Sequence, residues 1–327
     1  MTRIRYDADL DPRPLAGRTV AVIGYGNQGR AHALNLKDGG IHVRVGARPG
    51  GDAEARARDD GFTPTEIGEA VAGADVVALL LPDEVMGEVY EASVAPHLAG
   101  GATLSFAHGF ALRYGLVHPP SGVDVILVAP VGPGRLLRRA FADGGGIPVV
   151  VAVHADASGG ALHTALAYAA RLGGGKAGVF QTTVQQEVET DLFGEQAVIV
   201  GGVCALMEAG FDTLVEAGYA PELAYTECIH QMKLLVDMVH ERGMAGMRAG
   251  FSKTALYGDL TRGRRVVGEA SRAEMKRVLA EIRSGAFARE WLEEVEAGQP
   301  NLQKLLDERA RHPSEAVRRR LGAAAPE

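Results

Sequence analysis

The chain has 327 residues, which is enough for two domains of ordinary size. Hydrophobic residues make up 46% of it and charged residues 23%, and the net charge of −7 predicts no affinity for nucleic acid or an anionic membrane surface. The two cysteines, Cys204 and Cys228, are too few for a disulfide framework or a Cys-rich zinc site. Without a signal-peptide core or an apolar run of about 18 residues, the sequence predicts a cytoplasmic protein with no membrane span.

The N-terminal half alternates short apolar runs with helical patterns. Six of the runs are typical of buried strands: Thr19–Ile23, His42–Val45, Asp75–Leu81, Ala102–Phe106, Val123–Ala129 and Val149–Val153. Strands that alternate with helices predict a parallel sheet that is covered on both faces. We therefore expect a Rossmann-type, doubly wound α/β domain over residues 1–182.

A glycine-rich turn follows the first of these strands. Gly24-Tyr25-Gly26-Asn27-Gln28-Gly29 matches the pattern G-x-G-x-x-G, and a helical stretch runs from about Asn27 to Asp38. Glycines in this context let the backbone approach a pyrophosphate at the positive end of the helix. The motif predicts a dinucleotide site; a purely structural strand–helix turn is the alternative.

The segment after the second strand is expected to meet the adenosine ribose of a dinucleotide. It reads Gly46-Ala47-Arg48-Pro49-Gly50-Gly51-Asp52. Arg48 could stack on adenine or hold a 2′-phosphate, whereas Asp52 could accept from ribose hydroxyls and would repel a 2′-phosphate. Because no Ser or Thr lies between these two residues, the loop favours NADH over NADPH. A solvated turn with incidental charges is the alternative.

The C-terminal half carries helical patterns in place of strands from Gln185 onward. One helix face gathers Ile229, Met232, Leu235, Val236 and Val239, and a similar pattern covers 272–283. We expect an all-helical domain over residues 183–327.

Two pairs of polar residues on these helices have metal-binding spacing. Asp191 and Glu195 are four apart, so on a helix their carboxylates point the same way, about 6 Å apart at Cβ. Carboxylate oxygens are ligands for hard cations such as Mg²⁺. Glu227 and Gln231 have the same spacing, but the second member is an amide.

Segments from end to end of the chain carry a specific resemblance. They are Gly24-Tyr25-Gly26 to Ala33, Leu81-Pro82-Asp83-Glu84, Phe106-Ala107-His108-Gly109-Phe110, Gly144-Gly145-Gly146-Ile147-Pro148, Thr190-Asp191-Leu192-Phe193-Gly194-Glu195-Gln196 and Glu216-Ala217-Gly218-Tyr219-Ala220-Pro221-Glu222. The chain resembles the short bacterial ketol-acid reductoisomerases. The resemblance implies alkyl migration in a 2-hydroxy-2-alkyl-3-keto acid, then nicotinamide-dependent reduction, with two Mg²⁺ ions. It also implies a knotted helical domain, and a homodimer or larger assembly in which two chains build each active site.

The resemblance assigns roles to individual residues. Asp191, Glu195 and Glu227 match metal ligands, with Asp191 expected to bridge both ions and Glu227 also facing substrate. His108, at the carboxyl end of the sheet, is expected to order water or the nicotinamide end, with a structural role as the alternative. Ser252 matches a contact to the substrate carboxylate, although serine is common enough that a structural role stays open. The segment Leu81-Pro82-Asp83 is expected to line the cofactor site.

The chain also departs from the family pattern. Gln231 stands where the family has a fourth acidic ligand, and Val131 stands where it has a lysine. Leu256, Arg30 and Arg135 are further departures. An uncharged amide should hold a second Mg²⁺ weakly, so we expect one tight site and a second that is weak or empty. Loss of the lysine removes a charge and a proton donor beside the reacting oxygens.

These departures favour a repurposed reductase over an ordinary member of the family. Hydride transfer to a small keto-acid-like or imine substrate needs less polarisation than alkyl migration does. The first hypothesis is therefore an NAD(P)H-dependent, Mg²⁺-assisted reductase of a specialised pathway, with the migration weakened or lost. The alternatives are a working reductoisomerase, which converts 2-acetolactate to 2,3-dihydroxy-3-methylbutanoate for branched-chain amino acid biosynthesis, and a catalytically silent cofactor-binding paralogue.

Overall fold

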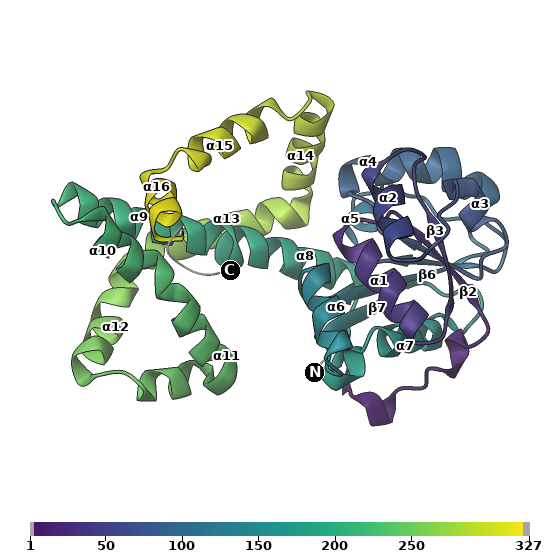
Figure 1. Ribbon diagram of the computed structural model, residues 1–327, viewed down its shortest axis with the longest axis horizontal. Coiled ribbons are helices and arrows are strands. Elements are labelled where there is room, and N and C mark those ends of the chain that lie inside the picture. The colour runs from purple at the N-terminus through teal and green to yellow at the C-terminus, as the bar shows by residue number, and fades with distance from the viewer. Residues whose placement is uncertain (1–2, 323–327) are drawn as a thin grey trace. The chain divides into compact units, whose positions relative to one another are not determined.

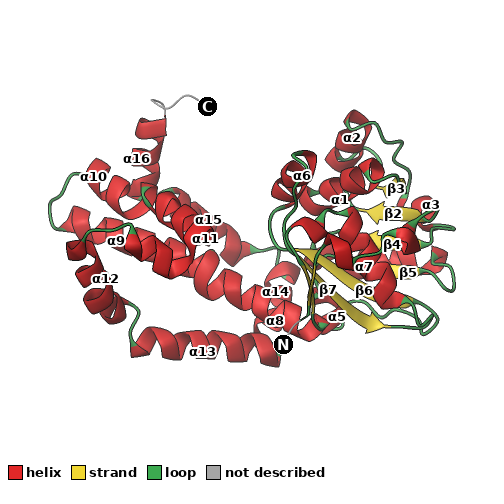
Figure 2. Cartoon of the chain, turned by 90° about the horizontal axis from the view of Figure 1, so that it is seen from below, coloured by secondary structure: helices red, strands yellow, loops and turns green. Residues whose placement is uncertain are grey.

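The structure is a computed structural model that describes residues 3–322 (Figures 1 and 2). The chain divides into two compact units, residues 1–188 and 189–327. The division falls within helix α8 (Val184–Gly194), shortly after Thr182, where the sequence predicts the end of the first domain. The first unit contains a sheet and the second is helical, so the two units are described separately.

An eight-stranded sheet forms the centre of the first unit. Its strands, in spatial order, are β1 (Ile4–Arg5), β8 (Val179–Gln181), β7 (Val149–Ala155), β6 (Asp124–Pro130), β5 (Thr103–Phe106), β4 (Val76–Leu79), β2 (Thr19–Ile23) and β3 (His42–Gly46). The predicted parallel pairing holds from β3 through β6. It does not extend to β7, which runs antiparallel to β6, or to β1, which runs antiparallel to β8. An apolar run specifies a buried strand but not its direction, so the sheet is mixed.

Both faces of the sheet are buried, which explains the continuously apolar strands. Successive residues of β2, such as Val22 and Ile23, point to opposite faces, and both are fully buried. The helices and helical turns of this unit are η1 (Asp7–Asp9), η2 (Arg13–Leu15), α1 (Asn27–Asp38), α2 (Asp52–Asp59), α3 (Ile67–Val71), α4 (Asp83–Val89), η3 (Tyr90–Val94), η4 (Ala95–His97), α5 (Phe110–Arg113), α6 (Gly134–Ala142), α7 (Ala161–Arg171) and η5 (Gly174–Lys176). Leu36 of α1 and Tyr168 of α7 belong to the same core as Val22.

The second unit is helical throughout its described residues, which confirms the predicted all-helical half. After α8 it contains η6 (Glu195–Ile199), α9 (Gly201–Glu216), α10 (Pro221–Tyr225), η7 (Thr226–His230), α11 (Met232–Ala249), α12 (Lys253–Val266), α13 (Glu269–Ser284), α14 (Ala286–Glu296), α15 (Pro300–Ala310) and α16 (Pro313–Gly322). Helix α11 bends at Gly243, whose φ of 66° lies in the left-handed region. The knot that the resemblance implies stays a prediction.

The core of this unit is small for its size. One buried apolar cluster consists of Phe211, Ala224 and Val317, and Ile282 and Ala288 are buried elsewhere among its described residues. Large apolar side chains on the same unit are exposed, including Ile199 at 68%, Leu223 at 61% and Leu234 at 59%. The apolar face predicted around Leu235 is half-buried within one chain, apart from Val236, which is 55% exposed.

One continuous helix, Val184–Glu216, is long and apolar enough to cross a membrane by length and composition alone. It includes α8, η6 and α9. Two acids on it pair with basic residues near the C-terminus: Glu208 with Arg309 of α15 (2.6 Å), and Asp212 with His312 just before α16 (3.2 Å). Charged groups in a lipid interior are costly, so this pairing favours burial against protein.

Candidate functional site

The glycine-rich turn between β2 and α1 has the geometry of an anion-binding turn. Gly24 has a φ of +91°, and a Cβ there would lie 2.7 Å from the Leu80 carbonyl oxygen. A Cβ on Gly29 would lie 2.0 Å from the Gly24 carbonyl oxygen, so both positions require glycine for packing. Gly26 differs, because a Cβ there would meet nothing within 4 Å, and no side chain caps the helix that begins after it. The N-terminus of α1 is thus open to an anionic ligand.

Tyr25, between these glycines, is held by a partner that sequence reasoning missed. Its side chain is 1% exposed, and its hydroxyl donates to Asp60 at 2.9 Å. Burial and the Asp60 carboxylate raise the pKa of Tyr25. The Arg30 guanidinium donates to the two Asp60 oxygens at 2.6 and 2.8 Å and holds the pKa of Asp60 below its usual range. Tyr25 can therefore offer a cofactor only its backbone. Arg30, one of the departures from the family pattern, has become an anchor for the end of α2.

A second loop is attached to the start of α1. The Gln28 side-chain amide donates to the Gly132 carbonyl at 2.9 Å, and the Arg135 backbone amide donates to the Asn27 side chain at 3.2 Å. This loop follows β6 and carries Val131, which is 56% exposed. The position where the family has lysine therefore lies in a loop fixed to the glycine-turn helix.

The other predicted cofactor residues follow neighbouring strands. Arg48 and Asp52, after β3, are both exposed, and Asp52 is the first residue of α2. Leu81, Pro82 and Asp83 follow β4, and Asp83 is the first residue of α4. Because β3 and β4 flank β2 in parallel, these residues follow the same edge of the sheet as the glycine turn. Ligands of this fold bind at that edge, where the strand order reverses.

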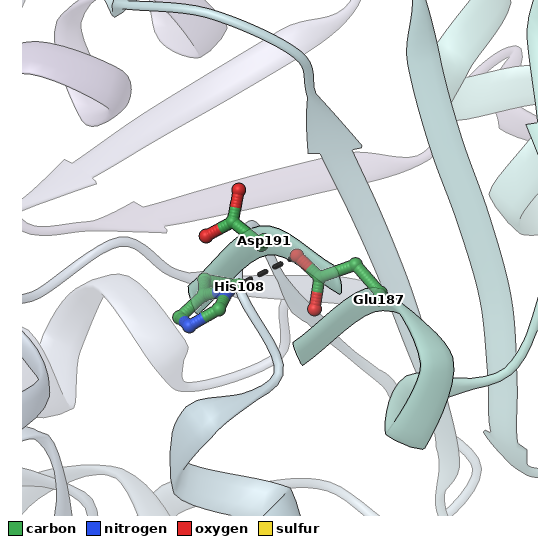
Figure 3. Close-up of side chains that lie close together, drawn as sticks. All are labelled: His108, Glu187 and Asp191. Carbon is green, nitrogen blue, oxygen red and sulfur yellow. Dashed lines mark hydrogen bonds and ion pairs between the residues drawn. The ribbon is translucent and has the colours of Figure 1, made fainter. Parts of the chain in front are cut away.

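His108 lies beside two carboxylates of α8 (Figure 3). Its Nδ1 lies 3.0 Å from Oε1 of Glu187, and the Gly109 amide donates to Oε2 of the same residue at 3.1 Å. Asp191 is one helical turn further along α8, and the ligand atoms of the three residues lie within 4.8 Å of one another. The Nδ1 atom of His108 is thus directed at Glu187, and the expected role of His108 toward water or the nicotinamide stays a prediction.

Glycine at position 109 allows this close approach. A Cβ there would lie 2.7 Å from a methyl of Val184 and 2.8 Å from a methyl of Val188, both on α8. Glu187 was missed by sequence reasoning although its spacing carried a signal. Glu187, Asp191 and Glu195 are each four residues apart, so the acidic pair is the end of a series of three.

The remaining predicted residues lie outside the three-residue cluster. Glu195 begins the π-helical turn η6, where the α-helical register ends. Glu227 and Gln231 pair with each other, since the Gln231 amide donates to Oε2 of Glu227 at 2.7 Å. Ser252 caps α12, and its hydroxyl oxygen accepts from the Ala255 amide at 3.2 Å. That bond leaves the Ser252 hydroxyl proton available, so its role toward substrate stays a prediction.

A glycine turn at the switch point of a doubly wound sheet, joined to a helical unit with clustered carboxylates, defines a dinucleotide-dependent oxidoreductase. Residues 14–178 match the acetohydroxy acid isomeroreductase NADPH-binding domain, and residues 184–327 match the ketol-acid reductoisomerase C-terminal domain. The chain belongs to the ketol-acid reductoisomerase family and is an NAD(P)H-dependent oxidoreductase.

Two solved structures illustrate the similarity. An NADH-preferring ketol-acid reductoisomerase from an uncultured archaeon is 41% identical, with 99% of this chain and 100% of that one covered and a TM-score of 0.96. A semialdehyde dehydrogenase NAD-binding protein from Cupriavidus necator, in complex with calcium and NAD, is 19% identical, with 82% and 99% covered and a TM-score of 0.64. The second likeness concerns the fold alone.

Proposed function

We propose that this protein is a nicotinamide-dependent reductase of the ketol-acid reductoisomerase family in which alkyl migration is weakened or lost. The observation that carries the proposal is the hydrogen bond between Gln231 and Glu227. The Gln231 side-chain amide donates to Oε2 of Glu227, with 2.7 Å between nitrogen and oxygen. Alkyl migration depends on polarising two oxygens together, and an amide adds no charge for that purpose. Val131 removes a second charge, because it stands where the family has a lysine, in the loop that is fixed to α1.

The residues present fit a hard cation. Glu187 and Asp191 offer carboxylate oxygens within 4.8 Å of each other, and Mg²⁺ prefers oxygen ligands. Asp191 and Glu195, which match metal ligands of the family, would hold the ion, with Glu227 as a further ligand. A bound Mg²⁺ would polarise the substrate oxygens. His108, a nitrogen donor beside Glu187, would order water or move a proton.

The site we propose is completed by a second copy of the chain. A helical unit that exposes large apolar side chains such as Ile199, Leu223 and Leu234 leaves much apolar surface to be covered. Glu227 and Gln231 form a separate pair in that unit, which accords with ligands supplied across a homodimer or larger assembly. Pairing of Glu208 and Asp212 with neighbouring helices supports a protein partner rather than lipid, and a cytoplasmic enzyme.

NADH is the proposed cofactor, with NADPH as the alternative. Asp52 lies where a ribose hydroxyl would be recognised, and a carboxylate there disfavours a 2′-phosphate. The 41% identical reductoisomerase is itself described as NADH-preferring. Arg48 favours the 2′-phosphate, and a comparison of kcat/KM for NADH and NADPH decides between the two cofactors.

A working reductoisomerase is the second candidate, favoured by that same 41% identity over nearly the whole chain. Two substrates separate the candidates. 2-Acetolactate requires alkyl migration before reduction, whereas 3-hydroxy-3-methyl-2-ketobutyrate requires reduction alone. The proposal expects NADH oxidation with the second compound, or another small keto acid or imine, and little with the first. Equal rates with both would establish the reductoisomerase. Binding of NADH without turnover of any such substrate would indicate a silent paralogue.

A further inference from the structure

Glu54, on the first turn of α2, makes two contacts that bear on cofactor choice. Its Oε2 accepts from the Gly50 backbone amide at 2.6 Å, and its Oε1 accepts from the Arg58 guanidinium at 2.6 Å. The Glu54 side chain is 16% exposed, whereas that of Arg58 is 62% exposed. The carboxylate is therefore held between the loop and the helix rather than free in solvent.

The loop that Glu54 holds begins beside the glycine turn. Gly46, the last residue of β3, is paired in register with Ile23, and its carbonyl accepts from the Gly24 amide at 3.0 Å. In a doubly wound dinucleotide fold, the adenosine ribose lies at the end of this second strand. Gly50, with a φ of +72°, lies in the loop between β3 and α2, the segment that meets the ribose in this type of fold.

A 2′-phosphate and a 2′-hydroxyl need opposite partners at this place. A phosphate is bound by backbone amides and guanidinium groups, whereas a ribose hydroxyl is well matched by a carboxylate acceptor. In this chain, the Gly50 amide and the Arg58 guanidinium are donors of these two kinds, and Glu54 accepts from both. Its negative charge also adds to that of Asp52, which lies on the same helical turn.

We propose that Glu54 is a specificity-determining residue that selects a 2′-hydroxyl over a 2′-phosphate by occupying these two donors. The inference rests on the proposed cofactor site and adds a second carboxylate to Asp52. Removing Glu54 frees an amide and a guanidinium and removes one negative charge. Affinity for a 2′-phosphate should then rise, while affinity for an unphosphorylated ribose should change little.

The test is calorimetric titration of the full-length protein with AMP and with adenosine 2′,5′-bisphosphate, followed by NADH and NADPH. For Glu54→Ala we expect the Kd of the bisphosphate to fall about tenfold, as for one gained charge-assisted hydrogen bond. The Kd of AMP should stay within about twofold. Glu54→Gln, which keeps an acceptor for Gly50 but loses the charge, should lie between Glu54→Ala and the unaltered protein. Glu88→Ala removes one exposed negative charge of α4 and should change neither Kd.

Each outcome separates the inference from the proposed function. An unchanged ratio of the two Kd values in Glu54→Ala, with AMP still bound, would overturn the role of Glu54 and leave the reductase proposal intact. An equal fall in both affinities would also overturn it, because it would show that Glu54 only supports the loop. If the unaltered protein binds none of the four nucleotides, the cofactor site itself is wrong.

Discussion

At the residue scale, Gln231 is where the chemistry of this chain departs most clearly from a paired-carboxylate site. Its amide donates to Glu227, so the pair is satisfied without a cation. A carboxylate at position 231 would repel Glu227 and so gain from a bound cation. Sequence alone identified the substitution, but the hydrogen bond that replaces the missing charge came from the structure.

We predict that Gln231→Glu strengthens the weaker Mg²⁺ site by about tenfold or more, because a charged ligand replaces a neutral one. Calorimetry with Mg²⁺ should resolve one tight and one weak site before the change. Gln303→Glu is the matched control, since Gln303 also donates to an acid four residues away, Asp307 at 3.0 Å. Two equally tight sites in the unaltered protein would refute the prediction. Asp191→Ala should remove metal binding at both sites.

At the element scale, helix α1 makes two side-chain contacts that its sequence pattern did not predict. The predicted limits, Asn27 to Asp38, agree with the observed ones, and the glycine pattern marked its start. The pattern did not reveal that Arg30 pairs with Asp60 or that His32 is buried against Tyr168. Both partners come from distant parts of the chain, and a local pattern holds no information about such contacts.

The Arg30–Asp60–Tyr25 contacts should hold the glycine turn in its binding conformation. We predict that Asp60→Asn raises the Kd for NADH about tenfold, because it weakens a charge-assisted pair and the Tyr25 bond together. The kcat should change less than about twofold, since no reacting atom is touched. Asp11→Asn, which alters an exposed pair with Arg13, should leave the Kd unchanged. A loss confined to kcat would contradict this role for Asp60.

Burial of His32 predicts how stability depends on pH. Desolvation lowers the His32 pKa to about 3, whereas the ordinary value is 6.5. The unfolded chain therefore takes up a proton first, and stability falls as pH drops below 6.5 toward 3. Between pH 7 and pH 5 this group should cost about 2 kcal/mol of unfolding free energy. Urea unfolding at both values should show a smaller loss in His32→Gln. An equal loss in both proteins would contradict the assignment.

At the scale of the whole molecule, the sequence predicted the α/β and all-helical units better than it predicted strand direction or the surfaces left exposed in one chain. Apolar runs such as Val76–Leu79 marked the strands, and helical periodicity marked the second half. The direction of β7 was not recovered, since burial does not encode direction. The uncovered side chains of Ile199 and Leu234 show why the site was predicted only in part. The proposed second copy would cover these side chains and supply the remaining ligands, and the pattern of one chain does not reveal either.

In the proposed function, reduction has been kept while alkyl migration has been weakened. Purified protein should be supplied with Mg²⁺, NADH or NADPH, and 2-acetolactate, and the nicotinamide absorbance followed. Losing one preorganised charged group costs about 10²–10³ in rate, so loss at both Val131 and Gln231 should leave little turnover. We predict that Val131→Lys combined with Gln231→Glu gains activity that the unaltered protein lacks. Robust turnover of 2-acetolactate by the unaltered protein would contradict the account.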